Sequence, residues 1–444
     1  MNKGSGSEVD SPYAWYAISL LTVASILSNI DRQILALMIG PVKRDLNISD
    51  VEVSLLLGLA FSLLFTVATL PAARLADRIS RKLIISMGVF TWSLMTAMSG
   101  VANSYSQLFL ARMGVGVGEA TLGPASYSIM SDYFSEARLP IAAGIFQTST
   151  FVGAGFAYIL GGTIVGYLET MPNFILPVLG EVRSWQLTFL IVGIPGVVLS
   201  LFIAKMREPA RKGIVNEGDD IEPFPIKEIG LFMLKRWKFF SLHFLGYLLM
   251  ATQGFALFVW GAEFFIRVHE FTRVQAGLWF GSIALVVGIA GSLSGGLFSA
   301  LLIRRGKVDG MMRLGMYKCL CIVPFAVALG VAPSSTLALL ALVPVVFLMA
   351  LTPGLGAAIV QAIAPNEIKA QMVAVYGVAV SFLSYLVAPL MVAVITQYVF
   401  AREDALGYSL ASLAAVIYPC AALCLGCCLV HYRESLRLAD AWAD

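Results

Sequence analysis

Charged side chains are scarce in this chain of 444 residues. Asp, Glu, Lys and Arg together make up 13% of it, whereas a soluble domain carries about 25%. Hydrophobic residues reach 59%, and the mean hydropathy is +0.84. Such a chain cannot keep its surface hydrated, so the composition excludes a soluble protein and indicates an integral membrane protein. The net charge of +3 gives no indication of nucleic-acid binding.

Groups that carry out catalysis are also few. The three histidines, His243, His269 and His431, are scattered, and no cysteine or carboxylate accompanies them at metal-ligand spacing. All six cysteines lie within apolar runs, where we interpret them as small lipid-facing or core residues. The sequence has no Gly-Lys-Ser/Thr phosphate loop, which argues against an ATP-driven pump. We therefore expect no enzyme activity, no metal and no cofactor.

What remains is twelve long apolar runs, six on each side of one polar stretch. A helix needs roughly 20 apolar residues to cross a hydrocarbon core about 30 Å thick. We expect spans over residues 14–38, 51–75, 83–102, 106–131, 140–165, 185–204, 239–262, 274–303, 311–331, 335–363, 371–397 and 408–431. Two equal sets of spans are typical of transporters built from repeats.

The fold class predicted is therefore an all-α membrane protein with twelve transmembrane helices in two six-helix bundles. The expected parts are an N-terminal tail (1–13), a first bundle (14–204), a central loop (205–238), a second bundle (239–431) and a C-terminal tail (432–444). With both tails in the cytoplasm, 21 of the 30 Lys and Arg residues lie on the inner side and 6 on the outer side. This bias predicts that orientation, in a plasma or inner membrane.

One inner loop carries a recognisable motif. Residues 73–82 read Ala73-Arg-Leu-Ala-Asp-Arg-Ile-Ser-Arg-Lys82. The motif resembles the G-x-L-x-D-R-x-G-R-K loop signature of the major facilitator superfamily, with Ala73 and Ser80 where glycines are usual. The resemblance implies the two-bundle major facilitator fold. The alternative interpretation is an ordinary basic inner loop.

We interpret this loop as part of an inner gate. Asp77 would face the positive N-terminal end of the predicted helix 371–397, and Arg81 would pair with Asp132. Such contacts would hold the inner gate shut in an outward-open state. The predicted inner-gate residues are Asp77, Arg78, Arg81, Lys82, Asp132 and Arg138.

Charged residues within the spans mark a candidate proton pathway. Asp31 and Arg112 lie at similar depths, and Arg112 and Glu119 share one helix face about 10 Å apart along its axis. We predict that Asp31 and Glu119 carry protons and share Arg112 as counter-ion. The neighbouring Arg32 points roughly 100° away from Asp31 and receives no role. The alternative is a static ion-pair network that joins the two helices.

Three segments narrow the resemblance to one branch of the superfamily. The segments Ser28-Asn-Ile-Asp-Arg-Gln33, Arg112-Met-Gly-Val-Gly-Val-Gly-Glu-Ala120 and Ser131-Asp-Tyr-Phe134 look like the Spinster-like branch. The resemblance covers roughly the first 165 residues well and the second half in outline. It implies proton-coupled movement of sphingolipids or lysolipids, and it implies that Asp31, Arg112 and Glu119 correspond to the buried charges of that branch.

The second half offers aromatic residues and little charge. We expect a substrate cavity lined by Gln253, Phe255, Phe258, Tyr376 and Tyr385, facing the charged first half and suited to an amphipathic substrate. Gln253 is either a head-group ligand or a helix-packing hydrogen-bond donor. The expected partners are an amphipathic solute or lipid, protons and the bilayer, with the protein acting as a monomer. Efflux of drug-like cations, transport of another small solute, or a non-transporting membrane sensor remain as alternatives.

Glycines concentrate in two predicted spans. Residues 106–131 contain Gly114, Gly116, Gly118 and Gly123, and residues 140–165 contain a second set, Gly144, Gly153, Gly155, Gly161 and Gly162. Glycine lets helices approach closely or bend locally in a membrane. We expect both sets to serve helix packing.

Overall fold

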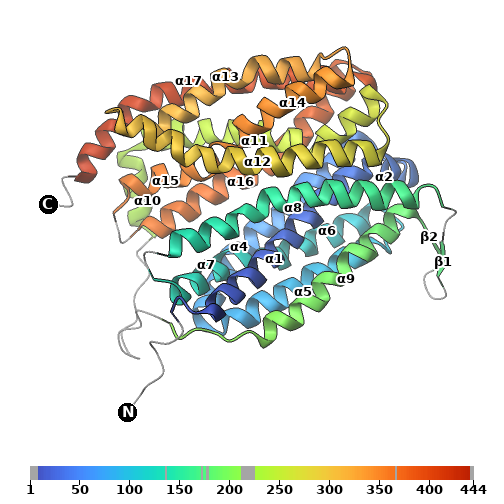
Figure 1. The fold of residues 1–444 in the computed structure, drawn as a ribbon, viewed down its shortest axis with the longest axis horizontal. Coiled ribbons are helices and arrows are strands. Elements are labelled where there is room, and N and C mark those ends of the chain that lie inside the picture. The colour runs from blue at the N-terminus through green and yellow to red at the C-terminus, as the bar shows by residue number, and fades with distance from the viewer. Residues whose placement is uncertain are drawn as a thin grey trace. The chain divides into compact units, whose positions relative to one another are not determined.

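The computed structural model describes residues 9–135, 138–171, 174–176, 180–211, 226–365 and 368–440 (Figure 1). The described chain is almost entirely helical, which confirms the predicted all-α fold class. It divides into two compact units. Unit 1 comprises residues 1–218 and 271–285, and unit 2 comprises residues 219–270 and 286–444.

Unit 1 holds the first set of helices. In chain order these are α1 (Pro12–Ile34), a 3-10 turn η1 (Leu35–Met38), α2 (Ile39–Leu46), α3 (Asp50–Leu55), a π-helical turn η2 (Leu56–Ala60), α4 (Phe61–Arg78), α5 (Arg81–Ser99), α6 (Tyr105–Glu119), α7 (Leu122–Tyr133), α8 (Leu139–Leu168) and α9 (Ser184–Lys205). A short antiparallel pair, β1 (Phe174–Leu176) and β2 (Gly180–Val182), lies between α8 and α9.

Unit 2 holds the second set. It contains α10 (Ile226–Lys235), α11 (Trp237–His269), α13 (Gly310–Gly330), α14 (Ser335–Ala350), α15 (Pro353–Ile363), α16 (Lys369–Val394), a π-helical turn η3 (Ile395–Val399), a 3-10 turn η4 (Glu403–Ala405) and α17 (Leu406–Asp440). One further helix, α12 (Arg273–Arg304), begins in unit 1 and ends in unit 2.

Within the described residues, eleven helices are long and apolar enough to cross a membrane. Large apolar side chains on them remain exposed, among them Leu297 at 71% and Leu423 at 69%. Patches of this kind require an apolar surrounding, which a bilayer supplies. The predicted span 106–131 is absent from the eleven because α6 ends at Glu119 and α7 starts at Leu122.

The predicted span 335–363 is among the eleven, but it also contains a short break. α14 ends at Ala350 and α15 starts at Pro353, a residue that suits the first turn of a helix because it lacks a backbone N–H. We expected both spans to be continuous, and the structure corrects this. The fourth span of each set is thus divided into two helices.

The same packing pattern occurs in both units. The third and sixth spans pack against each other as α5 with α9 and as α13 with α17, and the third and fourth spans as α5 with α6 and as α13 with α14. Figure 1 shows α5 and α9 running side by side. This recurrence within each unit supports the duplication that the equal sets of spans suggest.

Most glycines of α6 and α8 lie at close helix contacts, although a Cβ on Gly144 of α8 would meet nothing within 4 Å. A Cβ on Gly116 would lie 2.4 Å from the Phe61 carbonyl oxygen of α4, and one on Gly153 would lie 2.9 Å from the Ile26 carbonyl oxygen of α1. A Cβ on Gly162 would lie 2.7 Å from the Arg273 carbonyl oxygen. Backbone atoms cannot move aside cheaply, so these positions require glycine for packing.

Gly118→Ala is expected to destabilise the protein. Its Cβ would lie 2.6 Å from the Trp92 backbone nitrogen and 2.7 Å from the Gly88 carbonyl oxygen of α5. Overpacking of this kind costs typically about 1–3 kcal/mol, which differential scanning fluorimetry in detergent would detect as a lower Tm. Gly123→Ala is the matched control, because its Cβ would meet nothing within 4 Å and alanine favours helix. An equal loss of stability in both variants would contradict the packing role of Gly118.

Candidate functional site

The first buried ion pair joins α1 to α6. Arg112 donates from Nη1 to both carboxylate oxygens of Asp31, at 3.2 and 3.3 Å, and from Nη2 to the Asp31 carbonyl oxygen at 3.4 Å. Both residues are 2% exposed. Removing either partner from such a pair leaves an uncompensated buried charge. The predicted approach of Arg112 to Asp31 is therefore present in the structure.

The second ion pair lies beside the first. Arg32 contacts Glu119 through Nε at 2.6 Å and Nη2 at 2.5 Å, and the Ser28 hydroxyl donates to the same Glu119 oxygen, Oε2, at 2.7 Å. The Arg32 guanidinium also lies over the rings of Phe61 and Phe65, at 4.7 and 5.4 Å. Among the described residues, no hydrogen-bond partner reaches the other carboxylate oxygen of Glu119, Oε1.

The structure thus gives each acid its own arginine. We expected Arg112 to shift between the two acids as their shared counter-ion, and we assigned no role to Arg32. Instead of one shared counter-ion there are two pairs, Asp31 with Arg112 and Glu119 with Arg32. Arg32 points away from Asp31 on α1. Its side chain is nevertheless long enough to reach Glu119, the last residue of α6.

The inner-gate pair predicted from the loop motif also forms. The Arg81 guanidinium hydrogen-bonds the Asp132 carboxylate at the end of α7, the Ser128 hydroxyl at 3.0 Å and the Pro209 carbonyl at 3.0 Å. Its Nε lies 3.2 Å from the Glu208 carboxylate, which also accepts from the Arg81 backbone N–H at 2.8 Å. Arg81 is 2% exposed. We call these five residues the Arg81 cluster.

The other predicted inner-gate residues with described side chains are more exposed than Arg81. Arg78 is exposed and Lys82 is half-buried. Arg138 is exposed, and its Nε lies 3.9 Å from the carboxylate of Asp10, a long-range pair. The side chain of Asp77 lies outside the described residues, so its predicted contact with the helix at 371–397 stays a prediction.

Glu208 is a functional candidate that the sequence did not indicate. Burial alone raises the pKa of Glu208, but hydrogen bonds from the Ser80 hydroxyl and from the Arg81 backbone and side chain outweigh burial and lower it. Because the folded-state pKa of Glu208 is lowered, its carboxylate stabilises the fold at pH values above its ordinary pKa of about 4.3. This stabilisation is lost as the pH falls through the folded-state pKa.

The pH dependence of stability should therefore report on Glu208. We expect wild-type protein to have a higher Tm than Glu208→Gln at neutral pH, and the difference to disappear below about pH 4. Thermal unfolding of both proteins across pH 3–8 measures this. A difference that grows toward low pH would show that the carboxylate destabilises the cluster.

The structure shows the immediate neighbours of the predicted cavity residues of unit 2, and the cavity itself stays a prediction. Phe255 and Tyr385 are in ring contact at 4.5 Å between centroids, and Phe258 is half-buried. Tyr376 is 7% exposed and stacks on His243 at 5.5 Å. Gln253 is buried, and its amide lies 3.5 Å from the Leu410 carbonyl of α17, a distance at the limit for a hydrogen bond.

Unit 2 also contains a buried cation that we did not expect. Lys318 of α13 is 4% exposed, its Nζ lies 3.5 Å from the Thr352 hydroxyl, and it lies 5.5 Å from the Tyr418 ring. Thr352 lies at the interruption between α14 and α15. A cation near the C-terminal end of α14 compensates the negative end of that helix dipole.

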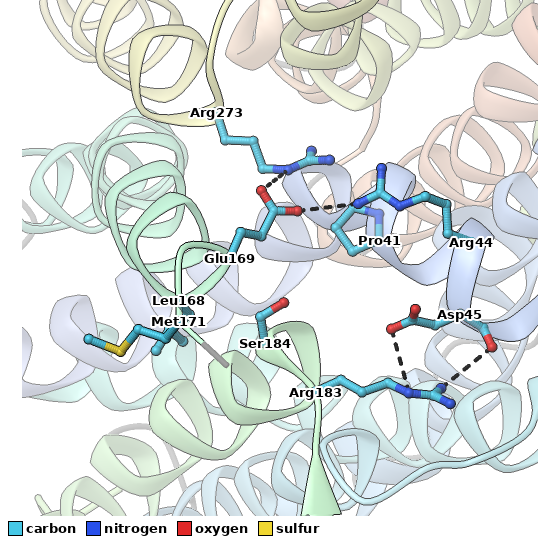
Figure 2. Close-up of a pocket in the computed structure, with 9 residues that line it drawn as sticks. All are labelled: Pro41, Arg44, Asp45, Leu168, Glu169, Met171, Arg183, Ser184 and Arg273. Atoms are coloured by element: carbon cyan, nitrogen blue, oxygen red, sulfur yellow. Dashed lines mark hydrogen bonds and ion pairs between the residues drawn. The ribbon is translucent and has the colours of Figure 1, made fainter. Parts of the chain in front are cut away.

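A polar cavity of about 370 Å³ lies in unit 1 (Figure 2). It is formed by α2, the end of α8, the start of α9 and the first residue of α12. The residues that line it are Pro41, Arg44, Asp45, Leu168, Glu169, Met171, Arg183, Ser184 and Arg273. Within the described residues, no group of three or more His, Cys, Asp or Glu side chains could hold a metal ion.

The fold and the buried charges define a class of protein. A family model described as Major Facilitator Superfamily matches residues 21–389, which is most of the chain. The chain therefore belongs to the Major Facilitator Superfamily, and it is a multi-pass membrane protein.

Individual relatives support the narrower resemblance. A crystal structure of a bacterial homolog to the human lysosomal transporter Spinster, in an inward-facing and occupied conformation, is 26% identical with a TM-score of 0.76, covering 96% of this chain and 97% of that chain. Protein spinster homolog 1 of Xenopus tropicalis is 28% identical over 63% of this chain and 53% of its own length. These matches confirm the predicted resemblance to the Spinster-like branch.

Another relative is named for a substrate. The protein named "Probable L-galactonate transporter" of Escherichia coli (strain K12) is 29% identical over 42% of this chain. The chain spans 37% of the length of that relative. The comparisons therefore include both Spinster proteins and a protein named for a sugar acid.

Proposed function

We propose that the protein is a proton-coupled secondary transporter that works by alternating access as a monomer. It acts in a plasma or inner membrane with both termini in the cytoplasm, and it moves an amphipathic lipid-like substrate, a sphingolipid or lysophospholipid. The observation that carries the proposal is the pair of buried ion pairs between α1 and α6, in which one oxygen of Glu119 accepts no hydrogen bond among the described residues.

Glu119 is the first site for a proton. Its Oε2 accepts from Ser28 and Arg32, whereas a proton could bind Oε1 without displacing any described hydrogen bond. Neutralising Glu119 would release Arg32, which keeps the favourable cation–π contacts with Phe61 and Phe65. The network therefore has two charge states that the same side chains can accommodate.

The change of charge would occur next to a break in the backbone. Glu119 is the last residue of α6, and Ala120 and Thr121 separate it from α7. Hinges in proteins are commonly a few residues at the ends of elements. We propose that protonation of Glu119 changes the angle between α6 and α7, and that the Arg81 cluster at the far end of α7 transmits this to the inner gate.

The substrate class rests on resemblance. The Spinster homolog structure matches nearly the whole chain, and the resemblance to the Spinster-like branch implies a lipid-like substrate. The relative named for L-galactonate favours a sugar acid as the second candidate. Both candidates use the same proton-coupled mechanism.

Transport into proteoliposomes under an imposed pH gradient distinguishes the two substrates. We expect a radiolabelled lysophospholipid to move faster with the gradient than without it, and unlabelled lysophospholipid to compete with it. Gradient-driven uptake of galactonate in place of lysophospholipid would replace the first candidate by the second. Equal rates with and without a gradient for both would contradict proton coupling.

A further inference from the structure

Arg273, which lines the cavity in unit 1, makes short hydrogen bonds to other groups of the protein. Arg273 donates from Nε to Glu169 Oε2 at 2.9 Å and from Nη1 to the Leu37 carbonyl at 2.8 Å, and it is 9% exposed. A Cβ on Gly40 would lie 2.7 Å from Arg273 Nη2, so glycine at this position leaves room for the guanidinium. The Arg273 guanidinium is therefore already hydrogen-bonded within the protein.

The other two arginines are held weakly. Arg44 Nη2 lies 3.5 Å from Glu169 Oε1, and Arg183 Nε lies 3.7 Å from Asp45 Oδ2. Strong guanidinium–carboxylate hydrogen bonds measure about 2.7–2.9 Å. Asp45 Oδ2 instead accepts a 2.8 Å hydrogen bond from the Trp185 indole. Arg44 and Arg183 thus retain hydrogen-bonding capacity, and Figure 2 shows them on two sides of the cavity.

Charge and shape favour an anion in this space. Three arginines and two carboxylates line the cavity, which leaves an excess of one positive charge. The planar fork of each guanidinium suits carboxylate and phosphate groups, and the Ser184 hydroxyl adds a neutral donor to the lining of the cavity. Ser184 also begins α9, whose N-terminal end carries partial positive charge.

We propose that this cavity binds an oxyanion, a carboxylate or a phosphate group, held by Arg44 and Arg183. The Glu169 carboxylate competes with the ligand for Arg44, because its Oε1 lies 3.5 Å from that guanidinium. The oxyanion belongs either to a free solute or to a lipid head group. The site is separate from the Asp31 and Glu119 pairs, and its occupancy does not depend on proton coupling.

Anion binding to the purified full-length protein in non-ionic detergent tests the proposal. The probes are sodium gluconate and inorganic phosphate, titrated by calorimetry at constant ionic strength. We expect Arg44→Gln to weaken binding about tenfold, in line with the loss of a charge-assisted hydrogen bond. Glu169→Gln should strengthen binding, because it removes the competing carboxylate. Arg44 is 68% exposed, so its variant should fold normally.

Arg402→Gln is the matched control. Arg402 is also exposed, at 61%, and pairs with Asp404 in unit 2, so its variant changes the net charge equally outside the cavity. Weakening by Arg402→Gln as large as that by Arg44→Gln would overturn the proposal, as would weaker binding in Glu169→Gln.

A further measurement with added lipid identifies the source of the oxyanion. If soluble anions do not bind, phosphatidylglycerol added to the micelles should raise the Tm of wild type but not of Arg44→Gln, which would assign the site to a lipid head group. The absence of an Arg44-dependent response to any of the three probes would overturn the proposal.

Discussion

Glu119→Gln is expected to abolish most pH-gradient-driven transport, by at least about tenfold, while leaving the protein folded. Gln has nearly the same shape as Glu and can still accept the Ser28 hydrogen bond, but it cannot take up a proton. Losing the group that couples the proton to the conformational change should remove the driving force and leave gradient-independent exchange in place. Initial rates in proteoliposomes, with and without a pH gradient, measure both.

Asp404→Asn is a suitable control for that experiment. Asp404 is an exposed carboxylate, paired with Arg402, and its neutralisation should leave gradient-driven transport unchanged. If Glu119→Gln retained the wild-type pH dependence, the Glu119–Arg32 pair would be a static link between α1 and α6, as the alternative interpretation of the sequence holds.

Arg81→Ala is expected to destabilise unit 1 strongly. Its side chain is almost fully buried and contacts α7 through Asp132 and the segment after α9 through Glu208 and Pro209. Removing one partner of a buried ion pair costs about 3–5 kcal/mol, because the remaining charge stays buried. We expect a large fall in Tm and in the yield of monodisperse protein.

Arg78→Ala provides the comparison in the same motif. Arg78 is an exposed residue at the end of α4, and surface substitutions of this kind usually change stability by less than about 0.5 kcal/mol. Should both variants lose stability equally, the contribution would come from the positive charge of the loop as a whole and the specific contacts of Arg81 would not matter.

The membrane architecture followed from the sequence because apolar length is a strong signal. Ten of the predicted spans correspond to uninterrupted stretches of helix or to helices continued by tight turns, as in α1, η1 and α2. The interruptions after Glu119 and after Ala350 were missed, since membrane helices tolerate glycine and both stretches are mostly apolar. Pro353 was the one available sign of a helix start in the second case.

The candidate site was predicted in part for a similar reason. Helical spacing placed Asp31 and Arg112 at similar depths and put Arg112 and Glu119 on one helix face. The loop motif placed Arg81 near Asp132. Helical spacing could not pair Arg32 with Glu119. It gives the direction in which a side chain leaves the helix, but a side chain as long as that of arginine can reach groups well away from that direction. Glu208 lies beyond a span without any motif, and Lys318 had no charged neighbour in sequence to indicate its burial.

Proton movement that accompanies substrate transport tests the central claim most directly. Proteoliposomes that contain a pH-sensitive dye are mixed with substrate in the absence of an imposed gradient. The account predicts a substrate-dependent change of internal pH with wild-type protein and none with Glu119→Gln. Substrate transport by wild type without any change of pH would contradict it.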